Sequence, residues 1–241
     1  MTLNLYYGNI NGMFLGVIMI MKFYDETGKR KDYYVRHPFN SGRYGAVYEI
    51  DGKTCLKNFY SGNDLEIVSV LKDIRDLKLD NFYEIYDLLF DINGELCGYT
   101  MKFYQDDDID IMSMPTDYTI ENLRKINASL KRLSEKKICA IDLKYHNTIM
   151  QSDKIIIIDT DLYYRSTCDE SKIYERNKDA LYRMFASLYY ATLTKKYLIT
   201  PNDDFYDLRG LFNQDDDIDM ICKKLSRYKY PIDYIYKRGR I

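Results

Sequence analysis

Four side chains that can hold a proton, a phosphate or a metal ion stand close together near the middle of the chain. Asp142, Lys144 and Asn147 follow one another in the order Asp-x-Lys-x-x-Asn, and Asp159 comes soon after them. In phosphoryl transfer one Asp orients the acceptor hydroxyl, an Asn and a second Asp hold magnesium, and a Lys stabilises charge on the moving group. The residue types and their order therefore point to phosphoryl transfer.

Regular elements are needed to position these side chains. The apolar residues between 122 and 137 recur at helical spacing, which predicts a helix that ends just before Asp142. Two apolar stretches, 148–150 and 155–158, are separated by a polar break and predict a hairpin of buried strands. Asp142, Lys144 and Asn147 would then leave a helix end, and Asp159 would lie at the end of the returning strand.

At these positions the chain resembles the protein-kinase family. The family's catalytic loop reads His-Arg-Asp-Leu-Lys-x-x-Asn and its metal motif reads Asp-Phe-Gly, whereas this chain has Ala-Ile-Asp-Leu-Lys-Tyr-His-Asn at 140–147 and Asp-Thr-Asp at 159–161. The resemblance implies that Asp142 accepts the hydroxyl proton and that Lys144 steadies the phosphoryl group. A solvated turn followed by a buried strand that ends in an Asp is the alternative interpretation.

The same resemblance implies a magnesium site. Asn147 and Asp159 would be ligands. Asp161, which replaces the final Gly of the metal motif, is similar to the second carboxylate of small-molecule kinases of the aminoglycoside and choline type. We therefore expect Mg bound by Asn147, Asp159 and Asp161.

A glycine-containing segment upstream resembles the family's glycine-rich loop. Residues 40–48 read Asn-Ser-Gly-Arg-Tyr-Gly-Ala-Val-Tyr, with Asn40 in place of the first Gly. Gly42 and Gly45 would let the backbone approach phosphates closely, and Tyr44 would cap the tip of the loop. An ordinary hairpin turn is the alternative for this segment taken alone.

Lys57 stands where the family places its phosphate-binding Lys. It lies on the second strand of a hairpin that is expected to turn at Asp51-Gly52. The resemblance implies that Val47 and Cys55 cover the face of adenine. A solvated Lys on a strand is the alternative.

Residues 64–79 are expected to form an amphipathic helix, with Asn63 or Asp64 as its N-cap. The resemblance implies that Glu66 on this helix pairs with Lys57. The alternative is that Glu66 only favours the positive end of the helix dipole.

Residues 82–90 and 95–103 predict a further hairpin across Asn93-Gly94. The second strand resembles the strand that enters the kinase hinge, so Met101 would guard the back of the nucleotide pocket. Lys102 to Tyr104, with Phe103 in the middle, would read adenine through the backbone. The acidic residues 106–108 are expected to be a solvated loop rather than a ribose contact.

The second half of the chain departs from the family in informative ways. A helix from residue 178 resembles the central helix of the large lobe, and its Asp179 would tie down the backbone of the catalytic loop. Between Asp159 and Asp179 there is no room for a long activation segment and peptide-docking loop, and no Ala-Pro-Glu. Ile141 replaces the Arg that reads an activation-loop phosphate, so regulation by such phosphorylation is not expected.

Composition bounds the alternatives. The chain has 241 residues, enough for one large domain or two small lobes, and 46% of them are hydrophobic. A net charge of −2 gives no basic signal for nucleic acid. The five cysteines have no metal-ligand spacing, which indicates reduced thiols and a cytoplasmic protein.

The apolar run at 13–21 is too short to span a bilayer, and its flanks do not fit a signal peptide. It is expected to be a strand of the small lobe. A translation start at Met21, which would make residues 1–20 an artefact, is left open.

Together these features are similar to a minimal, divergent, bacterial-type Ser/Thr kinase. The expected fold is α+β and two-lobed, with an uncertain extension at 1–20, a small β-rich N-lobe at 21–103 and a shortened, mainly helical C-lobe at 104–241. The expected activity is transfer of the γ-phosphoryl group of ATP, with Mg, to a protein Ser/Thr hydroxyl. The alternatives are a pseudokinase that serves as a binding module, and a small-molecule kinase.

Overall fold

The computed structural model describes residues 4–10, 13–63, 65–197 and 210–228. Over these residues the architecture is α+β, with an antiparallel sheet and four helices. The chain divides into two compact units, the first made of residues 1–79 and 83–104 and the second of residues 80–82 and 105–241. The sequence had placed the boundary between lobes at 103/104. Each unit is described below by itself.

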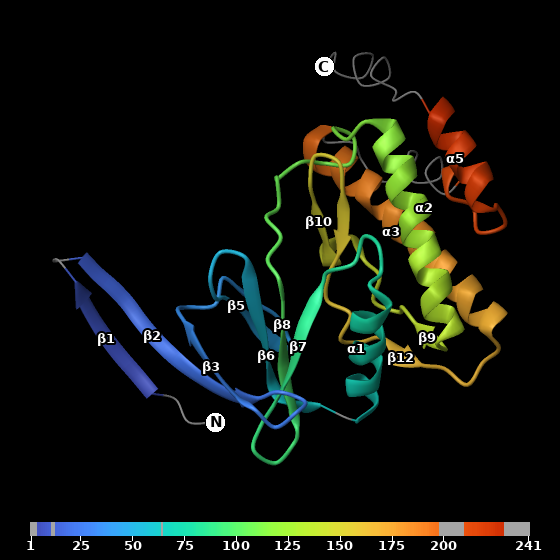
Figure 1. The fold of residues 1–241 in the computed structure, drawn as a ribbon. Helices are drawn as coiled ribbons and strands as arrows, with labels where there is room; N and C mark the ends of the chain where they lie inside the picture. The colour runs from blue at the N-terminus through green and yellow to red at the C-terminus, as the bar shows by residue number, and fades with distance from the viewer. Residues whose placement is uncertain (1–3, 11–12, 64, 198–209, 229–241) are drawn as a thin grey trace. The chain divides into compact units, whose positions relative to one another are not determined.

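The first unit is built on one sheet of eight strands (Figure 1). Seven strands run in the order β1-β2-β7-β8-β6-β5-β4, and β3 pairs with β2. The strands are β1 (Asn4–Ile10), β2 (Met13–Tyr24), β3 (Arg30–Val35), β4 (Asn40–Ser41), β5 (Gly45–Glu49), β6 (Thr54–Asn63), β7 (Ile85–Phe90) and β8 (Leu96–Lys102), and one helix, α1 (Leu65–Leu77), contacts β7.

The hairpins expected at Asp51-Gly52 and across Asn93-Gly94 are confirmed, and β2 and β3 form a further hairpin. The β2–β3 and β7–β8 turns are closed in the same way. In the β2–β3 turn the Asp25 carboxylate accepts hydrogen bonds from the backbone N–H groups of Thr27 (2.9 Å) and Lys29 (3.0 Å), and Gly28 has φ +80°. In the β7–β8 turn Asp91 accepts from the N–H of Asn93 at 2.8 Å. An Asp followed by a residue with positive φ closes a tight turn at low cost, because the carboxylate satisfies the backbone donors.

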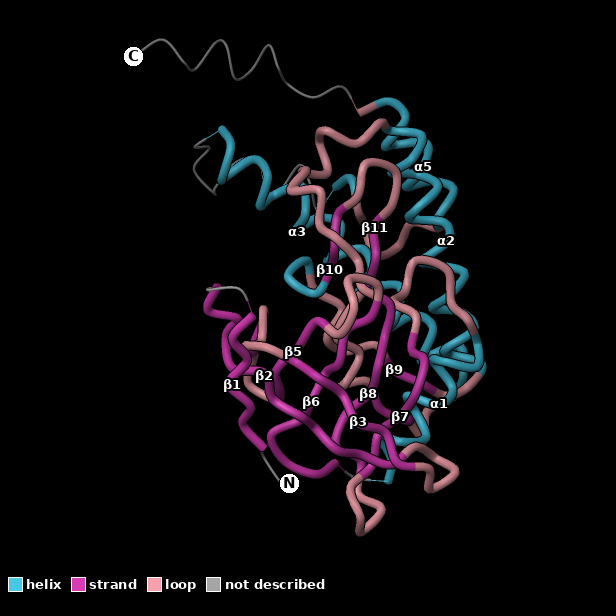
Figure 2. Tube along the Cα trace, turned by 60° about the vertical axis from the view of Figure 1, so that its left-hand side comes forward, coloured by secondary structure: helices cyan, strands magenta, loops and turns pink. Residues whose placement is uncertain are grey.

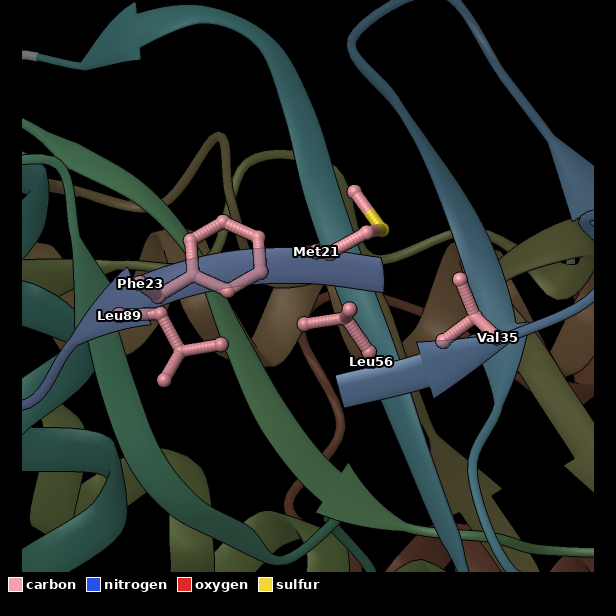
Figure 3. Close-up of a cluster of buried hydrophobic side chains, with 5 residues drawn as sticks. All are labelled: Met21, Phe23, Val35, Leu56 and Leu89. Carbon is pink, nitrogen blue, oxygen red and sulfur yellow. The ribbon is translucent and has the colours of Figure 1, made fainter. Parts of the chain in front are cut away.

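One buried apolar cluster of this unit lies on a single face of the sheet. Figure 3 shows Met21 and Phe23 of β2 gathered with Val35 of β3, Leu56 of β6 and Leu89 of β7. Each of these side chains is at most 3% exposed. Burial of an apolar side chain of this size contributes about 1.5–3 kcal/mol, so this cluster holds the strands together.

The apolar run at 13–21 is part of β2, as expected, and Met21 lies inside that strand rather than at its start. Helix α1 matches the expected 64–79 helix to within two residues at each end. The proposed cap at Asp64 lies outside the described residues.

The second unit is mainly helical. It contains α2 (Thr116–Glu135), β9 (Ile138–Cys139), a short 3₁₀ turn η1 (Tyr145–Asn147), β10 (Thr148–Met150), β11 (Ile155–Ile157), β12 (Tyr164–Arg165), α3 (Glu170–Tyr197) and α5 (Ile218–Arg227). Helix α2 contacts both α3 and α5 (Figure 1). Figure 2 shows β10 and β11 side by side as an antiparallel pair, which confirms the hairpin expected at 148–158.

Two helices start earlier than the sequence indicated. Helix α2 begins at Thr116 rather than 122, where the Pro115 carbonyl accepts the Thr119 N–H at 3.1 Å. Helix α3 begins at Glu170 rather than 178, and its first turn is fixed by the bond from the Ile173 N–H to the Asp169 carbonyl at 3.1 Å. The first two turns of α3 carry few apolar residues, so hydrophobic periodicity could not show them.

The interface between α2 and α3 forms the core of the second unit. Its fully buried side chains, all at 0% exposure, are Leu123, Ile126, Leu130 and Leu133 of α2 and Ile173, Leu181 and Phe185 of α3. Helix α5 packs on α2 near the end of the described residues. Within the described residues, no helix combines the length and apolar character needed to cross a bilayer.

Candidate functional site

The structure brings Asp142, Lys144 and Asn147 into direct contact. The Asn147 Nδ2 group donates to the Asp142 carbonyl at 3.0 Å and to the Asp142 Oδ2 at 2.9 Å, and the Lys144 ammonium forms an ion pair with Oδ1. The Asp142 side chain is 18% exposed and the Lys144 side chain 63% exposed. A carboxylate with both oxygens engaged by side chains of its own loop has a fixed orientation, as a group that positions a hydroxyl requires.

Backbone bonds tie this loop to the strand that leads to Asp159. The Asn147 N–H donates to the Lys144 carbonyl at 3.0 Å, which closes the 3₁₀ turn, and the Ile158 N–H donates to the Asn147 carbonyl at 2.9 Å. Strand β11 is fully buried, so the last residues before Asp159 are held firmly. Asp159 thus follows directly on a residue that is bonded to the Asn147 backbone.

Asp159 has the left-handed backbone angle φ +62°. This angle is uncommon for residues other than Gly, and Asp is among the side chains that adopt it most readily. Thr160 next to it is fully buried, and its carbonyl accepts the Tyr163 N–H at 3.0 Å. Asp159 and Asp161 are both half-buried. The unusual conformation turns the chain at the point where the sequence places a metal ligand.

The donor set at Asn147, Asp159 and Asp161 has the chemistry that Mg²⁺ prefers. The Asn147 amide nitrogen faces Asp142, so its Oδ1 is directed away from that carboxylate. Amide and carboxylate oxygens suit Mg²⁺, which usually takes few protein ligands and completes its shell with water and phosphate oxygens. Among the described residues there is no group of three or more His, Cys, Asp and Glu placed to hold a metal.

A buried Asn of α3 ties down the backbone at the start of the 140–147 loop. The Asn177 Oδ1 accepts from the Ala140 N–H at 2.8 Å, while Nδ2 donates to the Ile138 carbonyl and to the Ser134 Oγ, each at 3.0 Å. The side chain is 1% exposed. Asn177 therefore joins the end of α2, strand β9 and the start of the catalytic loop to α3.

The sequence had assigned this tether to Asp179, and that prediction was wrong. Asp179 instead forms an ion pair with Arg183 at 2.7 Å and accepts a hydrogen bond from Gln214. Residues two apart on a helix point in different directions, so Asp179 cannot reach the backbone that Asn177 holds. The position of Asn177 four residues after the buried Ile173 was the available signal, because it places a polar side chain on the inner face of the helix.

In the first unit, the glycine-containing segment forms a tight hairpin between β4 and β5. The Gly42 N–H donates to the Gly45 carbonyl at 2.9 Å, and Asn40 and Ser41 pair with Val47 and Ala46. Tyr44 at its tip is 46% exposed. The loop thus has the strand–turn–strand form expected of it.

The two glycines of this hairpin differ in their surroundings. A Cβ added at Gly45 would lie 2.4 Å from the Asn58 carbonyl oxygen, whereas one added at Gly42 would meet nothing within 4 Å. Gly45 is therefore required by the close approach of β5 to β6. No packing contact requires a glycine at position 42. A glycine there could instead serve the binding of a ligand by the loop.

The strand register places Val47, Cys55, Lys57 and Met101 on one face of the sheet. Val47 pairs with Lys57, and Cys55 pairs with Met101. Residues that pair directly across strands share a face, as do residues two apart on one strand. This face is the opposite of the one that carries Leu56 and the cluster of Figure 3. Four of the residues expected to surround a nucleotide are therefore neighbours.

Burial shapes the chemistry of this face. Lys57 is 7% exposed. Burying an ammonium group costs free energy unless anionic groups nearby compensate for its lost hydration. Burial also raises the pKa of the Cys55 thiol to about 12, so this side chain stays neutral and acts as a small apolar group. Glu66 lies exposed in the first turn of α1. Its pairing with Lys57 stays a prediction.

The strand expected to be the hinge has two of its backbone donors engaged. The Lys102 N–H donates to the Glu84 carbonyl at 2.9 Å, and the Phe103 N–H donates to the Lys53 carbonyl at 2.7 Å. Of the three hinge residues, Tyr104 is thus the better candidate for donating to a base. The Phe103 ring meets Phe39 edge-on, with centroids 5.8 Å apart, which adds an aromatic pair that the sequence had not indicated.

The acidic residues after the hinge have a structural use. The Asp107 Oδ2 accepts the Ser152 N–H at 2.9 Å and the Asp107 N–H donates to the Met150 carbonyl at 2.9 Å, so this residue binds the β10–β11 turn.

The chain was compared with models of known protein families and with curated protein sequences. No family model matches it, and no curated protein matches it either.

Proposed function

We propose that this chain is a phosphotransferase with a two-lobed, protein-kinase-like fold, which moves the γ-phosphoryl group of Mg-ATP to a hydroxyl. The observation that carries the proposal is the cluster of Asp142, Lys144 and Asn147. In this cluster one fixed carboxylate lies between an ammonium and an amide.

The residues of the second unit would divide the chemistry among them. Asp142 orients the acceptor hydroxyl and takes its proton, and Lys144 stabilises negative charge on the phosphoryl group in flight. Asn147, Asp159 and Asp161 fit a magnesium ion, which when bound neutralises phosphate charge. The ion pair between Lys144 and Asp142 keeps both groups in place before the substrates arrive.

The residues of the first unit would hold the nucleotide. Val47, Cys55 and Met101 offer an apolar surface to adenine, and the Tyr104 backbone N–H offers a donor. Lys57 supplies a positive charge for the α- and β-phosphates, positioned by Glu66, and the hairpin of Gly42, Tyr44 and Gly45 covers the phosphates.

Incubation with ATP labelled on its γ-phosphate tests the activity. The purified protein is incubated with labelled ATP, magnesium and either a whole or a desalted cell lysate, and the label is followed into protein and into small molecules. We expect label in one of these fractions, dependent on magnesium. A folded protein that binds ATP but transfers no label in either lysate would contradict the proposal and would leave a pseudokinase, a binding module on the same fold.

A further inference from the structure

A pocket of about 450 Å³ adjoins the catalytic loop within the second unit. Ile141, Leu143, Lys144 and His146 of the loop line one side, and Arg183 and Met184 of α3 line the other. This volume is in the range of about 300–1,000 Å³ that small-molecule sites occupy.

The pocket opens beside the candidate base. Ile141 and Leu143, the chain neighbours of Asp142 on either side, both line it, as does Lys144, whose ammonium is paired with the Asp142 carboxylate. A hydroxyl that loses its proton to Asp142 must come within about 3 Å of that carboxylate. Among the described residues Asp142 itself does not line the pocket, so a molecule seated there must extend past Lys144 to present such a hydroxyl.

The lining combines apolar and cationic side chains. Ile141, Leu143 and Met184 are apolar, Lys144 and Arg183 are positively charged, and none of the described residues that line the pocket carries a carboxylate. Arg183 contacts Asp179 through Nη2, one of the three nitrogens of its guanidinium, and its side chain is 70% exposed. A guanidinium has five N–H donors in a fork that suits a carboxylate or phosphate, so this contact leaves donors for an anion.

The segment between Asp161 and α3 is already hydrogen-bonded to other parts of the second unit. Strand β12 pairs with β9, the Ser166 N–H donates to the Lys137 carbonyl at 2.8 Å, and the Arg165 Nη1 donates to the Lys136 carbonyl at 2.8 Å. An extended peptide binds by adding itself to backbone groups that are not yet bonded. This short, bonded segment favours a small acceptor over a protein segment.

We propose that this pocket holds the phosphoryl acceptor, and that the acceptor is a small alcohol with an apolar body and an anionic group. This inference rests on the proposed function and replaces the expectation of a protein Ser/Thr acceptor. In the transfer the acceptor oxygen forms a bond to the γ-phosphorus as the bond from that phosphorus to the bridging oxygen of ADP breaks. The hydroxyl proton passes to Asp142. Arg183 binds the anionic group and thereby sets the orientation of the hydroxyl.

Three alcohols of equal shape and different charge test the pocket. They are 4-(hydroxymethyl)benzoate, 4-(hydroxymethyl)benzamide and 4-(aminomethyl)benzyl alcohol, whose charges at neutral pH are negative, zero and positive. Binding is measured by saturation-transfer NMR on the full chain without nucleotide, so the result does not depend on catalysis. We expect the benzoate to bind about tenfold or more tightly than the amide, since a charge-assisted hydrogen bond contributes that much, and the amine to bind most weakly.

Variants assign the preference to one side chain. Arg183→Ala should abolish the preference for the benzoate, and Arg183→Lys should keep part of it. Arg176→Ala, which removes an exposed Arg of the same helix outside the pocket, should change nothing. Equal binding of the three alcohols, binding of none, or a charge preference that survives in Arg183→Ala would overturn the inference.

An assay of phosphoryl transfer distinguishes failure of this inference from failure of the proposed kinase activity on which it rests. Label from γ-labelled ATP that enters only protein would refute the small anionic acceptor while upholding the kinase. A charge preference that depends on Arg183, without transfer from ATP to any acceptor, would uphold the anion-binding pocket and refute the kinase.

Discussion

At the scale of single residues, the two glycines of the β4–β5 hairpin have different roles: one is required by packing and the other is proposed to serve ligand binding. Gly45 leaves no space for a Cβ, which would meet the Asn58 carbonyl oxygen at 2.4 Å, whereas Gly42 has open space. We expect Gly45→Ala to lower the free energy of unfolding by about 1–3 kcal/mol, as overpacking does. Gly42→Ala should leave that free energy unchanged to within about 0.5 kcal/mol and should weaken ATP binding, because the backbone could no longer approach the phosphates as closely.

Urea unfolding and calorimetric titration with Mg-ATP measure the two effects. An ATP affinity of Gly42→Ala equal to that of the wild type would remove the phosphate-binding role from the hairpin. A stable Gly45→Ala would show that β5 and β6 can separate without cost.

The cysteine thiols give a second residue-scale prediction. The Ser166 hydroxyl and the positive charges of Arg176 and Lys172 lower the pKa of the Cys168 thiol below its usual range. Burial raises the pKa of Cys55 to about 12. Because the thiolate is the reactive form, Cys168 should be alkylated first by iodoacetamide at pH 8 and Cys55 much later.

Mass spectrometry of peptides from a time course of alkylation locates each modified thiol. Cys168→Ser should remove the fast phase and leave the slow ones. A fast phase located at Cys55 in the folded protein would contradict the burial of the sheet face that carries Lys57.

At the scale of elements, α3 holds the catalytic loop through one side chain. Asn177 bonds to the Ala140 N–H, the Ile138 carbonyl and the Ser134 Oγ. Asn177→Ala leaves these buried groups without partners, and each such loss costs about 1–3 kcal/mol. We expect a decrease of about 3 kcal/mol in the free energy of unfolding and a slower transfer reaction, because the backbone before Asp142 loses its support.

Asp179→Ala is the matched control on the same helix. Its ion pair with Arg183 is near the surface, and such pairs contribute at most about 1 kcal/mol. Urea unfolding of both variants compares them directly. A larger loss in Asp179→Ala than in Asn177→Ala would return the tether to the residue that the sequence indicated.

Some elements could be predicted from local sequence patterns, and others could not. The hairpins were predictable because each turn carries its own chemistry, as in Asp51 with Gly52 and in Asp91 with Gly94. The starts of α2 and α3 were not, because their first turns are polar and lie outside the apolar period. For the buried tether Asn177, helical spacing from Ile173 could place the side chain on the inner face of α3, but its partners at 134, 138 and 140 are far away in the sequence.

At the scale of the whole molecule, the sequence identified the residues within each unit that the structure brings together. Asp142, Lys144 and Asn147 are in contact, and Val47, Cys55, Lys57 and Met101 share a face of the sheet. Motif spacing found them because the hairpins fix the spacing between these residues. The pocket beside the loop was not foreseeable, because its two sides come from the catalytic loop and from α3.

The measurement that tests the central claim most directly is the rate of phosphoryl transfer by Asp142→Asn. Asn keeps the shape of the side chain but cannot take the hydroxyl proton, and a positioned general base contributes about 10²–10⁴-fold to the rate. The account predicts a fall of that size with an unchanged affinity for Mg-ATP, while the control Asp153→Asn, in the exposed β10–β11 turn, keeps the wild-type rate. A rate for Asp142→Asn equal to that of the wild type would contradict the account.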